Sequence, residues 1–199
     1  KVINYIIDDC GVCPDCKHHH ENICSNFTKG TAYFNENGFS GFYGFSEYAV
    51  VKARHLYVYP KETPDDEAAF TEPLACVINS INRSHIKMGD DVVVIGGGVM
   101  GLLHVLCAKR QGARVILSET DAKRRAFGLK LGADNVIDPL EFDPVEQVKK
   151  LTNGRGANVV ENTTAIPSVA AQAIQMTAKS GLCNMFSSIH PNEPILVDA

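Results

Sequence analysis

The chain has 199 residues, of which 45% are hydrophobic and 21% are charged. This balance is typical of an ordinary globular protein rather than a disordered or membrane-embedded one, and no apolar run approaches the ~18 residues that span a bilayer. The formal net charge is −4 and no run of basic residues interrupts the sequence. Nucleic acid and anionic membrane surfaces are therefore not expected as main partners.

The seven cysteines are unevenly distributed, because four of them lie close together near the start of the chain. The other three are scattered through apolar or helical context. Scattered thiols of this kind indicate a reducing compartment, where a tight cysteine cluster is more typical of a metal site than of a set of disulfides. The protein is therefore expected to be cytoplasmic.

The clustered cysteines are Cys10, Cys13, Cys16 and Cys24. Their segment has too few large apolar side chains to fold around a core, but four thiolates at this spacing can enclose one Zn²⁺ and supply the missing folding free energy. An iron–sulfur cluster is the main alternative, although ferredoxin-type sequences continue with a shorter gap and Cys-Pro. A nucleic-acid zinc knuckle would need more basic residues nearby. We interpret His18, His19 and His20 as solvated loop residues, because four cysteines already complete a tetrahedral site.

The segment around this cluster reads as largely β structure. Strands are expected over residues 1–9, 45–51 and 56–60, with a loop over 26–44 and the start of a helix over 63–69. Glu72 then precedes Pro73 in an otherwise apolar stretch. A carboxylate buried there would need a cation or a hydrogen-bond donor, whereas the alternative is an exposed residue near a helix end.

An apolar strand ending at Ile95 leads directly into a Gly-x-Gly-x-x-Gly sequence. Its glycines have distinct expected roles: Gly96 permits a tight turn, Gly98 lets the backbone approach a pyrophosphate, and Gly101 lets the following helix pack closely on the strand. The N–H groups of that helix, which begins near Val99 and Met100, would face the phosphates. This pattern predicts a dinucleotide-binding site.

The next strand, over residues 113–118, ends at Glu119, where an acidic residue would accept hydrogen bonds from the adenosine ribose hydroxyls. Its charge would repel a 2′-phosphate, so NAD is expected in preference to NADP. Arg124 and Arg125 follow one helical turn later. We expect these two arginines to face solvent or to lie over the adenine, rather than to take over the role of Glu119.

From Asp90 onward, strands and helices alternate. The expected helices cover residues 99–111, 122–131, 144–151 and 168–177, and the further strands cover 135–138, 157–161 and 181–186. Alternation at this spacing predicts an α/β fold with a doubly wound parallel (Rossmann) sheet and right-handed crossovers.

Several motifs together resemble the zinc-containing medium-chain dehydrogenase family, which includes alcohol, sorbitol and threonine dehydrogenases. They are the cysteine lobe, Phe45-Ser46-Glu47-Tyr48, Glu72-Pro73-Leu74, the glycine turn with Glu119, and residues 154–161. The resemblance implies that residues 1–75 are part of a β-rich GroES-like catalytic domain with a structural zinc lobe. Residues 76–199 would then be a Rossmann domain that is incomplete at its C-terminus.

The resemblance also implies a function, namely zinc-dependent hydride transfer between NAD(H) and a secondary alcohol such as a polyol or small hydroxy compound. Glu72 stands where sorbitol-dehydrogenase-like members have a catalytic glutamate that contacts zinc directly or through its bound water. The family's Gly-His-Glu motif and its earlier zinc-binding cysteine would precede Lys1, so the isolated chain is expected to be inactive. A homodimer or homotetramer is expected. Asn162-Thr163-Thr164-Ala165 departs from the family, which often has glycine after this strand.

Two other functions remain open at this point. Methyltransferases that use S-adenosylmethionine also follow an apolar strand with a glycine-rich turn and an acidic residue, and a dehydrogenase scaffold can serve as a non-catalytic dinucleotide-binding protein. The methyltransferase alternative leaves the cysteine lobe and Glu72 without a role.

Overall fold

The computed structural model describes residues 1–5, 7, 9–26, 47–48, 51, 53–188 and 194–196. The chain divides into two compact units, Lys1–Thr71 and Glu72–Ala199. The compact units divide at the start of the helix Thr71–Arg83. The domain boundary expected between residues 75 and 76 falls within this helix and stays a prediction. Among the described residues, no helix is both long enough and apolar enough to cross a bilayer.

The first unit contains a two-stranded antiparallel sheet, in which β1 (Val2–Asn4) pairs with β2 (Leu56–Val58). The strand expected over residues 1–9 is thus confirmed over Val2–Asn4. Beyond it, the N–H of Tyr5 donates to the carbonyl of His55 at 2.7 Å, in the 3-10 helix η3 (Ala53–His55) that precedes β2. The expected strand over 45–51 and the loop over 26–44 lie mostly outside the described residues.

Besides η3, the described part of this unit contains the short helices α1 (Pro14–Lys17), η1 (Glu21–Ile23) and α3 (Asp65–Ala68). The helix start that was expected over residues 63–69 is confirmed by α3, whose first turn is acidic.

The second unit is a five-stranded parallel sheet in the order β5-β4-β3-β6-β7. Its strands are β3 (Asp91–Ile95), β4 (Arg114–Ser118), β5 (Asn135–Ile137), β6 (Ala157–Asn162) and β7 (Thr177–Met185). Its helices are α4 (Thr71–Arg83), α5 (Val99–Arg110), α6 (Ala122–Lys130), α7 (Pro144–Leu151) and α8 (Pro167–Met176).

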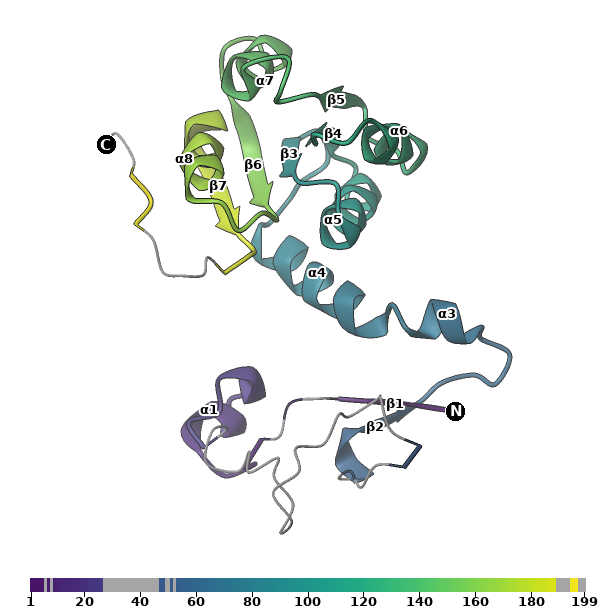
Figure 1. The fold of residues 1–199 in the computed structure, drawn as a ribbon. Helices are drawn as coiled ribbons and strands as arrows, with labels where there is room; N and C mark the ends of the chain where they lie inside the picture. The colour runs from purple at the N-terminus through teal and green to yellow at the C-terminus, as the bar shows by residue number, and fades with distance from the viewer. Residues whose placement is uncertain are drawn as a thin grey trace. The chain divides into compact units, whose positions relative to one another are not determined.

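Helices cover both faces of this sheet (Figure 1). Val92 and Val94 of the central strand pack in one cluster with residues of α4 and α5, whereas Val93 and Ile95 pack in another with residues of α7 and α8. A strand that is buried on both faces reads as the continuous apolar run seen in the sequence. The predicted doubly wound α/β fold is confirmed.

Two elements of the second unit, α4 and β7, differ from those expected from the sequence. α4 was not predicted, although Leu74, Val77 and Ile81 repeat at helical spacing and Pro73 is tolerated in a first helical turn. β7 begins at Thr177 directly after α8, rather than at Gly181. Its pairing with β6 is interrupted by a register shift, and Ser180 has a φ of 63° within the extra residues.

Candidate dinucleotide and metal sites

The turn between β3 and α5 has the backbone geometry that its glycines require. Gly96 has a φ of 95°, in the left-handed region that favours glycine. A Cβ on Gly101 would lie 1.8 Å from the carbonyl oxygen of Gly96, so α5 can pack on the turn only because this position has no side chain. A Cβ on Gly98 would meet nothing within 4 Å. Gly98 therefore borders open space.

That space is a cleft of about 440 Å³ at the carboxyl ends of the strands. The chain runs from β3 toward β4 on one side and returns to β6 on the other, so the cleft lies where the strand order reverses. Open parallel sheets bind ligands at this point. The residues that line the cleft include Gly96, Gly98, Val99, Met100, Gly101, Glu119, Arg124, Thr163 and Gln172.

Glu119 lies in this cleft with only 6% of its surface exposed. One carboxylate oxygen accepts a hydrogen bond from the backbone N–H of Gly97, and the other accepts from the N–H of Asp121 at 2.8 Å and from the Thr120 hydroxyl at 3.0 Å. Burial raises the pKa of Glu119, but these donors and the nearby Arg124 outweigh that effect, so its pKa lies below the ordinary value. The cleft thus contains an ionised acceptor next to the glycine turn.

The two arginines after Glu119 behave differently from each other. The Arg124 side chain is 59% exposed, and its guanidinium lies 4.0 Å from the Glu119 carboxylate. Arg125 does not match the expectation of an exposed side chain, because it is 17% exposed and pairs with Asp138 at 2.7 Å. It also donates to the carbonyls of Glu119 and Thr120. These contacts leave Arg124 as the cationic side chain of this pair that borders the cleft.

The segment after β6 forms the opposite wall of the cleft. The Thr163 hydroxyl donates to the carbonyl of Ile95 at 2.7 Å, and a Cβ on Gly96 would lie 2.8 Å from that hydroxyl oxygen. Asn162 accepts from both the N–H and the hydroxyl of Thr164. The sequence showed only that this segment departs from the family pattern, because its contacts join parts of the chain that are distant in sequence.

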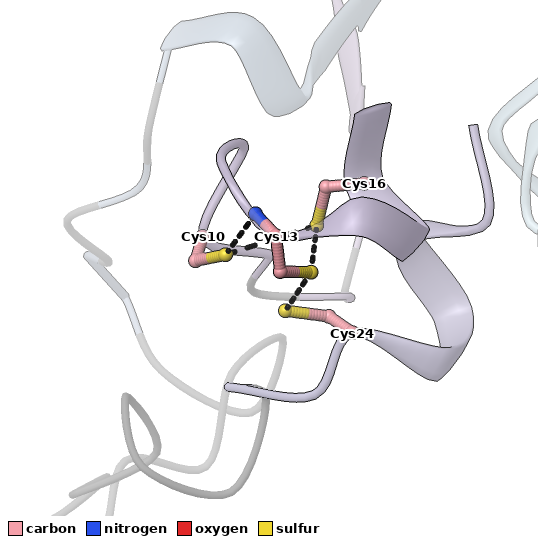
Figure 2. Close-up of side chains that lie close together, drawn as sticks. All are labelled: Cys10, Cys13, Cys16 and Cys24. Carbon is pink, nitrogen blue, oxygen red and sulfur yellow. Dashed lines mark hydrogen bonds between the residues drawn. The ribbon is translucent and has the colours of Figure 1, made fainter. Parts of the chain in front are cut away.

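The four clustered cysteines converge in the first unit (Figure 2). Their sulfur atoms all lie within 4.8 Å of one another, and Cys13, Cys16 and Cys24 are buried. The Sγ of Cys13 lies 3.4 Å from that of Cys16 and 3.9 Å from that of Cys24. Zn–S bonds of about 2.3 Å place the sulfur atoms of a tetrahedral site about 3.8 Å apart, so this arrangement fits one zinc ion.

The thiols of this cluster differ in pKa because their surroundings differ. A hydrogen bond from the Asn26 amide, together with the N–H groups of Val12 and Cys13, lowers the pKa of Cys10 to about 6. Burial and a hydrogen bond with Cys13 raise the pKa of Cys16 to about 12. His18, His19 and His20 are exposed and are not among the converging groups.

Glu72 lies in the first turn of α4 and is exposed. Its carboxylate accepts a hydrogen bond from the Cys76 thiol at 3.4 Å. Among the described residues, the four cysteines are the one group of three or more candidate ligands that converge, and Glu72 is not part of it. Its role at a catalytic metal therefore remains a prediction.

A second hollow, of about 380 Å³, is lined by residues of the loop before β6 and of early β7. It includes Arg155 and Lys179, and it lies at the amino end of β6 rather than at the carboxyl ends of the strands. The glycine turn and Glu119 are not among its lining residues.

Comparison with known proteins agrees with this geometry. Residues 99–198 match a family model described as zinc-binding dehydrogenase. L-threonine 3-dehydrogenase of Thermococcus kodakarensis is 33% identical over 185 residues, which cover 92% of this chain and 50% of that protein. Sorbitol dehydrogenase of Halalkalibacterium halodurans is 35% identical over 174 residues, which cover 86% of this chain and 49% of that protein.

A crystal structure from Sinorhizobium meliloti, described as a zinc-binding dehydrogenase bound to NADP, superposes with a TM-score of 0.86 at 28% identity. The match covers 99% of this chain and 56% of that one. The chain thus spans about half the length of the curated relatives that it matches. On these matches, the chain belongs to the zinc-containing medium-chain dehydrogenase family.

Proposed function

We propose that the whole protein oxidises a secondary alcohol with NAD and that this chain supplies the dinucleotide cleft. The observation that carries the proposal is the ionised carboxylate of Glu119 beside the glycine turn, at the point where the strand order reverses. The N–H groups at the start of α5 provide donors for a pyrophosphate. Membership of a dehydrogenase family favours hydride transfer over methyl transfer and over a non-catalytic binding role.

The proposed substrates are polyols, sugar alcohols and small hydroxy compounds. Relatives with this pattern act on threonine and sorbitol according to their names. We further propose that Glu72 contacts a catalytic zinc whose other ligands lie in the part of the relatives' length that this chain does not span. When bound, such a zinc would supply Lewis-acid polarisation of the alcohol oxygen, and bound NAD would supply the hydride acceptor.

We propose that the cysteine cluster holds a structural zinc. Four sulfur ligands would leave no open position for a substrate, which is the arrangement of a structural rather than a catalytic site. Self-association into a dimer or tetramer and a cytoplasmic location are further expectations for the whole protein.

NAD is the proposed cofactor, even though the Sinorhizobium relative was crystallised with NADP. The Glu119 charge opposes a 2′-phosphate in the same place, and such opposed charges cost several kcal/mol. An exposed arginine contact contributes about 1 kcal/mol or less, and Arg124 is largely exposed. A preference for NAD of about tenfold or more follows, since each ~1.4 kcal/mol provides that factor.

The experiment that tests the proposal is an equilibrium titration of the chain with NADH, NADPH and S-adenosylmethionine, read by calorimetry. We expect saturable binding of one NADH, weaker binding of NADPH and no binding of S-adenosylmethionine. Absence of saturable NADH binding, or preferential binding of S-adenosylmethionine, would rule the proposal out.

A further inference from the structure

A cluster of polar side chains lies inside the second unit, behind the dinucleotide cleft. Its members come from α4 and the residue after it, from α5, from β6 and from β7: Ser80, Ser84, His104, Glu161 and Asn184. The side chains of His104 and Glu161 are fully buried. A buried carboxylate is costly unless donors satisfy it.

Glu161 is satisfied by hydroxyl and amide donors. Ser84 donates to one carboxylate oxygen at 2.5 Å, and Asn184 donates to the other at 2.8 Å. A carboxylate oxygen accepts hydrogen bonds, so it faces the donor end of a neighbouring amide. The Glu161 carboxylate therefore fixes the direction of the Asn184 amide, which must present its NH₂ group.

The same Asn184 NH₂ group donates to the Ser80 hydroxyl oxygen at 2.7 Å. The single hydroxyl hydrogen of Ser80 then has two possible acceptors, His104 Nε2 at 3.0 Å and Glu161 at 3.1 Å. The other nitrogen of His104, Nδ1, lies 2.8 Å from the Met100 carbonyl and must carry a hydrogen, because a carbonyl only accepts.

The protonation state of the His104 imidazole determines whether its Nε2 can accept the hydroxyl hydrogen of Ser80. Burial lowers the pKa of the His104 imidazole, although the Met100 carbonyl and Glu161 act in the opposite direction. A neutral imidazole with hydrogen on Nδ1 leaves Nε2 as an acceptor for Ser80. When Ser80 donates to Nε2, the donors form one directed chain, from Asn184 to Ser80, to His104 and to the carbonyl of Met100.

Met100 lies in the first turn of α5 and lines the dinucleotide cleft. The chain of donors thus ends at a helix turn that borders the cleft. We propose that Glu161 is a positioning residue for the dinucleotide cleft, acting through Asn184, Ser80 and His104 on the first turn of α5. The inference rests on the proposed function only in taking a nicotinamide dinucleotide as the ligand.

Ser80 and Ser84 provide a matched pair of variants. Both hydroxyls contact Glu161, but Ser80 alone of the two also contacts His104. Ser80→Ala should weaken NADH binding roughly threefold to tenfold, the effect of one lost hydrogen bond in a chain of donors. Ser84→Ala keeps the contacts of Ser80 with Asn184 and His104, so it should weaken NADH binding less than Ser80→Ala does, although both substitutions lower the melting temperature.

A third variant, Asp91→Asn, separates positioning from a general loss of stability. Asp91 is a buried carboxylate at the amino end of β3, away from the cleft, where it pairs with Arg114 at 2.5 Å. Asp91→Asn should lower the melting temperature without changing NADH affinity. If Ser80→Ala weakens NADH binding no more than Ser84→Ala and Asp91→Asn do, the proposal is overturned.

Amide hydrogen exchange of the chain without cofactor gives a second readout. Exchange in the segment 96–103 should accelerate more in Ser80→Ala than in Ser84→Ala. Equal exchange in the two variants would overturn the proposal. Because this comparison needs no cofactor, it still decides the question if the unsubstituted chain fails to bind NADH, a result that would refute the proposed function instead.

Discussion

Glu119 combines two tasks at the residue scale. Its carboxylate holds the Gly97 and Asp121 N–H groups in the structure, and the same charge is the proposed basis of cofactor choice. Glu119→Ser removes the charge and keeps a hydroxyl acceptor. We expect NADPH to gain affinity relative to NADH by about tenfold. Paired titrations of the two cofactors measure this ratio, and an unchanged ratio would show that another residue makes the choice.

Arg124 offers a complementary test of the same site. Its guanidinium is exposed at the cleft, whereas Arg125 is held by Asp138. In the Glu119→Ser background, Arg124→Ala should cancel the gain of NADPH, and Arg125→Ala should instead lower stability. Binding and melting measurements on both variants distinguish these effects. An equal loss of NADPH affinity in both would contradict the assignment of Arg124.

The burial of His104 predicts how the free energy of unfolding depends on pH. Burial holds its folded-state pKa below the ordinary value of 6.5, so the unfolded chain takes up the proton first as the pH falls. The stability linked to this group is complete above pH 6.5 and is lost as the pH drops from there toward the lower folded-state pKa. Denaturant unfolding at a series of pH values should show a shallower decline in this window for His104→Gln. An identical pH dependence would contradict the prediction.

At the scale of elements, two glycines between β3 and α5 have different roles: Gly101 is needed for packing and Gly98 for ligand binding. Gly101→Ala would place a Cβ against the Gly96 carbonyl and should destabilise the fold by about 3 kcal/mol. Gly98→Ala has open space around its Cβ, so it should leave stability unchanged and weaken NADH binding. Thermal melts and NADH titrations of the two variants measure both effects. Normal NADH affinity in Gly98→Ala would show that the phosphates do not approach this turn.

The cysteine lobe is the second element with a direct test. Cys24→Ser should remove the bound zinc and make the segment 9–26 sensitive to protease, because four thiolates replace a hydrophobic core there. Cys107→Ser is the matched control, since Cys107 lies in α5. Metal analysis of the purified variants should find zinc only in the control. Zinc retained by Cys24→Ser would refute the four-cysteine site.

The sequence was most informative where a local pattern determines the backbone. Gly112 and Gly132, for example, follow α5 and α6 with φ values of 82° and 107°, in the left-handed region that favours glycine after a helix. It was less informative where a contact with a distant residue decides: Arg125 is held by Asp138, which nothing in the adjacent sequence indicates. The apolar residues of α4 repeat at helical spacing around Pro73, and this local pattern by itself predicts a helix.

At the scale of the whole molecule, the two candidate sites depend on local sequence patterns, whereas the polar cluster around Glu161 depends on contacts between distant residues. The glycine turn and the cysteines are close in sequence, so their spacing reveals their chemistry. Glu161 and Ser80 are 81 positions apart, and only the sheet topology brings them together. Glu161 is the last residue of the family motif over residues 154–161, but nothing near it in the sequence indicates its partners. Long-range polar contacts of this kind need a structure.

The central claim is that a nicotinamide dinucleotide binds at the glycine turn, and chemical-shift mapping of the chain with NAD tests it most directly. The account predicts that amide resonances of Gly96–Gly101 and of Thr120 and Arg124 move together and saturate with one binding constant. The second hollow, with Gly154, Gly156 and Lys179, should not respond. Shifts confined to that hollow, or no saturable shifts at the glycine turn, would contradict the account.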